Sequence, residues 1–153
     1  MATDSVATQI KDMLENNWSL VGRLLASEMH FEAGWYNADW SNNPQVTVTR
    51  LLSGDLEYFG RTIGHADMHY ISRDIYAVSI WLSVPSGSDG SEEETDLDLI
   101  INEIIRILVN QTSSFAPPLG RVLPVNRGRT LSVFNQTPRL VRWEIPVWAN
   151  YIS

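Results

Sequence analysis

The segment that most constrains the fold is the C-terminal RLVRWEIPVWANYI, residues 139–152, in which side chains of two kinds alternate. A period of two predicts a strand with one buried face. We expect that core face to carry Val141, Trp143, Ile145, Val147, Ala149 and Tyr151. The opposite face carries Arg142, Glu144, Pro146, Trp148 and Asn150. Because proline has no backbone N–H to donate, Pro146 predicts an edge strand, or a bulge at that point.

Three further segments have the pattern of strands. QVTVTRLL (45–52) is β-branched and alternating, and TLSVFNQ (130–136) precedes the last strand as the first arm of a short hairpin. DIYAVSIWLSV (74–84) has a uniformly apolar face that we expect in the core, whereas Trp81 points the other way. Residues 53–73 could hold a short strand or an ordered excursion toward a neighbour.

Two segments have helical periodicity. The first, residues 4–18, repeats apolar side chains at Val6, Ile10, Met13, Leu14 and Trp18. The second, residues 95–111, begins at Thr95, which with Asp98 resembles a capping box, and follows an acidic loop that contains Glu92, Glu93 and Glu94. This second helix also has apolar residues outside its main stripe, at Leu99, Ile107 and Val109, so we expect it to contact more than one surface.

The order of these elements predicts an α+β fold in which residues 1–153 form a single domain. We expect a mainly antiparallel sheet of four to five strands, with the N-terminal helix and one long helix packed on one face. No run of about 18 apolar residues is present, and the N-terminus lacks a signal-peptide pattern, so we expect a soluble protein without a membrane partner. The chain contains no cysteine, which excludes disulfides and thiolate ligands.

The charge of the chain argues against a nucleic-acid binder. It has 18 acidic and 11 basic residues, a formal net charge of −7, and no cluster of Lys and Arg. Phosphate-backbone binding needs clustered cations. A negative surface is compatible with DNA that passes by without being bound.

Few residues suggest chemistry. His65 and His69 are four positions apart, a spacing that on a helix would suit a metal, but the surrounding sequence does not favour a helix. Glu28, His30 and Glu32 alternate and would share one face of a strand. No nucleophile, oxyanion loop or phosphate-binding glycine loop accompanies them. We therefore predict no catalytic residues, no metal and no cofactor.

The segments that carry a resemblance to a known family are the leading helix, the Trp- and Tyr-rich passage ending in NNPQVTVT, the strand YAVSIWLSV, the acidic loop, the helix DLDLIINEIIRILVNQ and the final LVRWEIPVWANY. The order of these elements resembles that of the tail terminator or tail-completion proteins of tailed viruses. The resemblance covers nearly the whole chain. It implies a structural virion protein of the tail or neck, assembled in the host cytoplasm. Such a protein forms a ring, commonly a hexamer, which caps the tail tube and joins it to the neck or connector protein, with DNA passing through the lumen.

A ring subunit needs apolar surface beyond its own core. Our candidates for the surface that meets a neighbouring copy or partner are Trp81, Ile107, Arg142, Glu144, Pro146 and Trp148. The alternative is a small-ligand or carbohydrate-binding module, or a metal-dependent enzyme that uses His65 and His69. The six tryptophans leave a sugar-stacking platform open as part of that alternative.

Overall fold

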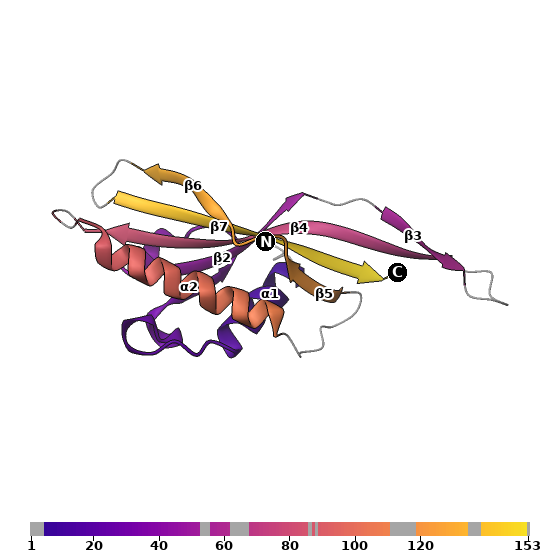
Figure 1. Ribbon diagram of the computed structural model, residues 1–153, viewed down its shortest axis with the longest axis horizontal. Coiled ribbons are helices and arrows are strands. Elements are labelled where there is room, and N and C mark those ends of the chain that lie inside the picture. Colours follow the sequence, from indigo (N-terminus) through magenta and orange to yellow (C-terminus); the bar gives the residue numbers. More distant parts are fainter. Residues whose placement is uncertain are drawn as a thin grey trace.

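A computed structural model describes residues 5–52, 56–61, 68–85, 87, 89–110, 119–134 and 139–152. The chain forms one long, twisted sheet with two helices on one side of it (Figure 1). The helices are α1 (Ser5–Asn16) and α2 (Ser91–Val109), with three short 3-10 turns between α1 and β2. The strands are β1 (His30–Ala33), β2 (Gln45–Leu52), β3 (Leu56–Arg61), β4 (Met68–Val84), β5 (Leu119–Pro124), β6 (Arg129–Phe134) and β7 (Arg139–Ile152).

The sheet is built around the long antiparallel pair of β4 and β7. On the outer side of β4, β2 pairs with one part of the strand and β3 with another. On the outer side of β7, β6 pairs with the first part of the strand and β5 with the last part. β1 extends the sheet beyond β2 and is parallel to it. The predicted α+β fold with helices on one face is confirmed, although the sheet is mixed and has seven strands.

The main core lies between the sheet and the two helices. Tyr76, Val78 and Ile80 of β4 are completely buried there, as are Ile145 and Val147 of β7. Opposite them, α1 and α2 contribute the buried side chains of Val6, Ile10, Met13, Leu14, Ile100, Ile104, Ile107 and Leu108. The predicted core faces are confirmed at Ile145, Val147 and Ala149 of β7 and at Val6, Ile10, Met13 and Leu14 of α1, whereas Val141 and Trp143 are half-buried and the Tyr151 side chain lies outside the described residues. Of the helices in the described part of the chain, none is long and apolar enough to cross a bilayer.

The prediction that the last strand is an edge is wrong, because β7 has strand partners on both sides. Pro146 fits there since the position of its missing N–H faces the junction between β5 and β6, where the ladder is interrupted. At that junction the Val125 N–H donates to the Pro146 carbonyl at 2.9 Å. The connecting turn lies so close that a Cβ at Gly128 would be 2.3 Å from the Glu144 carbonyl oxygen, so only glycine fits.

Two other boundaries differ from the prediction. The long helix begins at Ser91, so Glu92, Glu93 and Glu94 form its first turn rather than a loop. The N-cap is Gly90, and Asp89 before it accepts hydrogen bonds from the Ser91 N–H and hydroxyl. Acids are favoured at a helix N-terminus. β5 was not predicted, because prolines flank it; Pro124 is its last residue, where the strand can end.

The buried carboxylate of Glu103 in α2 binds the segment that follows α1. Glu103, only 4% exposed, accepts hydrogen bonds from the Ser19 N–H and hydroxyl and from Arg106 Nε at 2.7 Å. Burial by itself would raise the pKa of Glu103, but the hydrogen bonds from Arg106 and Ser19 outweigh burial and hold that pKa below its ordinary value. The ionised form of Glu103 therefore stabilises the helix layer.

Candidate interaction surface

The candidate site lies on the sheet face opposite the helices, which we call the second face. Cross-strand register places Gln45, Trp81 and Arg142 in one row, and Thr47, Ser79, Glu144 and Arg129 in the next. Further along the strands, Ile75, Trp148 and Leu123 form another row. One half of this face is closed over and the other half is open, and the two halves are described in turn.

The closed half is organised by Arg142. Its guanidinium contacts the rings of both Trp35 and Trp81, 4.7 and 4.9 Å from their centroids. It donates to Ser79 Oγ at 3.2 Å and to Glu144 Oε2 at 3.3 Å. Arg142 and Glu144 are 9% and 8% exposed, so both charges are almost removed from water, and each requires the other. We call Trp35, Trp81, Arg142, Glu144 and Ser79 the Arg142 cluster.

Trp81 is part of this cluster and is only 2% exposed. Its Nε1–H donates to Thr47 Oγ1 at 2.9 Å, and the Tyr36 ring lies 5.1 Å away. Burial raises the pKa of Tyr36. Trp81 does point away from the main core, but the chain itself covers it. The sequence had suggested that Trp81 supplies exposed apolar surface, and the structure shows that it does not.

The cover over Trp81 is held by a buried glutamine. The Asn37 N–H donates to Gln45 Oε1 at 3.0 Å, and Gln45 Nε2 donates to the Asn37 carbonyl at 2.8 Å. This pairing imitates a backbone ladder and fixes the loop that carries Trp35 and Tyr36. Gln45 has no exposed surface, so the loop position is set from inside the fold.

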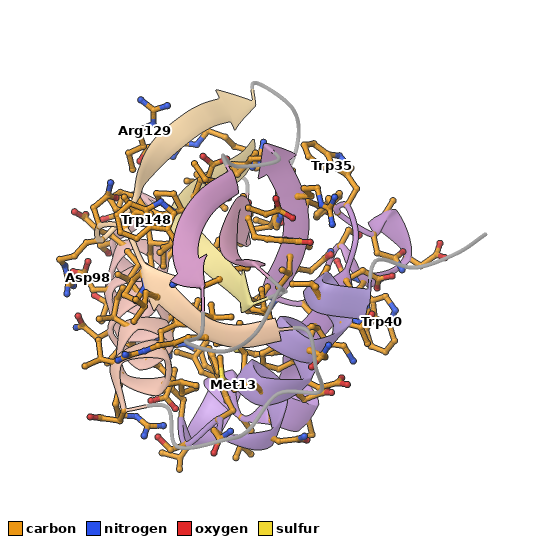
Figure 2. The ribbon with its side chains drawn as sticks, turned by 90° about the vertical axis from the view of Figure 1, so that its right-hand side faces the viewer. Met13, Trp35, Trp40, Asp98, Arg129 and Trp148 are labelled. Carbon is orange, nitrogen blue, oxygen red and sulfur yellow. The ribbon has the colours of Figure 1, made fainter. Side chains whose placement is uncertain are left out.

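The open half is centred on Trp148, which is 36% exposed. Ile75, Leu123 and Pro146 lie on the same face beside it and are half-buried. We call these four residues the Trp148 strip. In Figure 2, Trp148 lies on the opposite side of the view from Trp35, with Arg129 above it. The predicted exposure of Trp148 on the face opposite the core is confirmed.

An exposed arginine flanks each end of the Trp148 strip. Arg121 is opposite Asn150, on one side of the Trp148 row, and Arg129 is opposite Glu144, on the other. Neither forms an ion pair with another residue of the described part of the chain. Neither arginine was predicted from the sequence, although Arg121 and Leu123 alternate around the buried Val122 in β5. A hollow of about 410 Å³ adjoins the strip, lined by the turn of residues 126–129 and by Glu144 and Pro146.

Acidic side chains gather at the start of α2. A groove of about 370 Å³ there is lined by Asp89, Glu93, Glu94 and Asp98, with Arg139 across from them. Arg23 neutralises part of this charge, since it binds Asp96 at 2.6 Å and Glu92 at 3.4 Å. Glu94 and Asp98 remain exposed and, within the described residues, have no ion-pair partner.

The remaining candidates fall outside this surface. Ile107 is 4% exposed and belongs to the main core, so it cannot supply free apolar surface. His30 and Glu32 share a face as predicted and are in direct contact, and the His30 ring stacks on Trp40 at 4.6 Å. His65 lies outside the described residues, and His69 belongs to β4 but its side chain is not among those described.

The described residues contain no cluster of three or more side chains that could hold a metal ion. A comparison with models of known protein families found no match. A comparison with curated proteins also found none.

Proposed function

We propose that this chain is a structural subunit of a viral tail or neck, which assembles with further copies into a ring that caps the tail tube. In this role it joins the tube to the connector while DNA passes through the lumen. The observation that carries the proposal is the Trp148 strip. A 36% exposed tryptophan in a row of apolar side chains, with two arginines beside it, is typical of a surface that a protein partner covers.

The edges of the sheet support the same proposal. β1 and β3 are the outermost strands on one side, and β5 and β6 on the other. Outermost strands carry backbone donors and acceptors that can pair with another chain. A subunit that meets one neighbour on each side through different surfaces forms a closed ring when the rotation between copies closes.

The charge of the chain fits a lumen that DNA traverses. The net charge is −7, so a ring of such chains has a negative surface. Such a surface repels the phosphate backbone and so does not retain DNA. The subunit would then need no sequence-specific contact with the DNA that passes it.

Light scattering coupled to size-exclusion chromatography tests this function, together with negative-stain electron microscopy of the same fractions. We expect a concentration-dependent shift from the 17.3 kDa chain to a closed ring of one defined size. A chain that remains monomeric at every accessible concentration would contradict the proposal.

A further inference from the structure

We infer that the partner of the Trp148 strip is the acidic start of α2 in a second copy of this chain. The inference rests on the proposed function, because it assigns the two surfaces through which neighbouring copies would meet. The strip offers apolar side chains with exposed arginines at both ends, and α2 offers an exposed apolar side chain among exposed acids. The two surfaces are complementary in charge and in chemical kind.

On the strip, the positive charge is available for a partner. Arg121 and Arg129 are exposed and form no ion pair within the described part of the chain. By contrast, Arg23, Arg106 and Arg142 are each bound to a carboxylate of their own chain. In an acidic chain, two arginines without a carboxylate among the described residues, beside an exposed tryptophan, favour an acidic partner.

On α2, the complementary side chains are Glu94, Asp98 and Leu99. Glu94 and Asp98 are exposed, and Leu99 is 45% exposed. Asp98 and Leu99 lie on one side of the helix with residues 95 and 102, and Glu94 lies one turn before Asp98 at the border of that side, because positions three and four apart are neighbours. Leu99 would contact Trp148 and Leu123, while the carboxylates, about 6 Å apart along the helix, approach the arginine at one end of the strip.

The two surfaces are far enough apart for one copy to use both. A methyl group at Gly90 would lie 3.6 Å from Arg139 Nη2, so the start of α2 lies beside the first residue of β7. Trp148 is further along the same strand by roughly 30 Å, at about 3.3 Å per residue. Figure 1 shows the start of α2 at the left of the molecule and the C-terminal end of β7 right of its centre. Because the two surfaces differ, the contact is heterologous, as a ring requires.

Two charge-reversal variants of the full chain test the contact. One is Arg121→Glu with Arg129→Glu, and the other is Glu94→Arg with Asp98→Arg. Each variant places like charges at the contact, so we expect self-association to weaken at least about tenfold in sedimentation velocity. In an equimolar mixture every contact is again between opposite charges, so association should return, with the two variants alternating.

A matched control is Glu28→Arg with Asp39→Arg, which changes the net charge as much as the acidic-side variant but at exposed residues outside both surfaces. This control should associate like the unmodified chain. Circular dichroism establishes that each variant is folded. If the unmodified chain forms rings and the reversed variants form them equally well, or if mixing restores nothing, the contact is overturned while the proposed function stands. If the unmodified chain stays monomeric, both fall.

Discussion

Trp81 and Trp148 lie on the same face of the same sheet, on adjacent strands, yet one is 2% exposed and the other 36%. The difference arises from the rest of the chain. Over Trp81, the loop held by Gln45 brings Trp35 and Tyr36 into ring contact. Over Trp148, the described residues leave more than a third of the side chain uncovered. The described part of the chain therefore covers one half of its second face and leaves the other half open.

The largest effect is expected from Trp81→Ala. The substitution removes a buried indole, its hydrogen bond to Thr47 and one of the two rings that contact Arg142. We expect a loss of about 4 kcal/mol in the free energy of unfolding, measured by urea denaturation. Trp35→Ala is the control, since Trp35 is 60% exposed and should cost about 1 kcal/mol. Equal losses for the two variants would show that the closed half is not packed as described.

Arg142→Met is expected to cost about 3 kcal/mol, because it leaves the Glu144 carboxylate buried without its cation. The double variant Arg142→Met with Glu144→Leu removes both charges and should be more stable than Arg142→Met alone. The same urea titrations measure both. The double variant could instead lose as much free energy of unfolding as Arg142→Met and Glu144→Leu lose separately, added together. The unpaired Glu144 carboxylate would then not explain the loss in Arg142→Met.

The closed and open halves also differ in how well the sequence predicted them. Alternation in residues 74–84 and 139–152 predicted both core faces, because a period of two is a local property of the chain. The burial of Trp81 could not be predicted in this way. It depends on a loop, some 40 positions earlier in the chain, that folds over the sheet through Gln45. The exposure of Trp148 was predicted because no such long-range cover was assumed.

At Pro146, too, the sequence predicted a local property but not the position of the residue in the sheet. Its missing N–H indicates a position without a ladder bond, and the structure has such a position at the junction of β5 and β6. The sequence correctly predicted a missing ladder bond at Pro146. It wrongly predicted that β7 is an edge strand, because β5 was not recognised. Without β5, Arg121 could not be assigned to the second face. The interaction surface was therefore predicted only in its central residues, Pro146 and Trp148.

Glu103 provides a comparison on the other side of the sheet, because its contacts to Ser19 and Arg106 stabilise the helix layer. Its pKa is lowered in the folded chain, so its stabilisation is fully present above its ordinary pKa of 4.5 and is lost as the pH falls through the lower folded value. Glu103→Gln should cost about 2 kcal/mol at neutral pH through weakened charge-assisted hydrogen bonds. It should also flatten the dependence of stability on pH below 4.5, followed by urea titrations across that range. An unchanged slope would mean that other carboxylates cause the acid sensitivity.

The smallest effect on stability, and the most informative, is expected from Trp148→Ala. Because the side chain is 36% exposed and belongs to the open half, its removal should cost no more than about 1 kcal/mol of unfolding free energy. If the open half is a contact surface, the same substitution should still weaken self-association strongly, since aromatic residues at the centre of an interface dominate its energy. Urea titration and sedimentation velocity on the same preparation separate the two effects. Global unfolding of the variant would instead assign Trp148 to the core, and the contrast with Trp81 would then disappear.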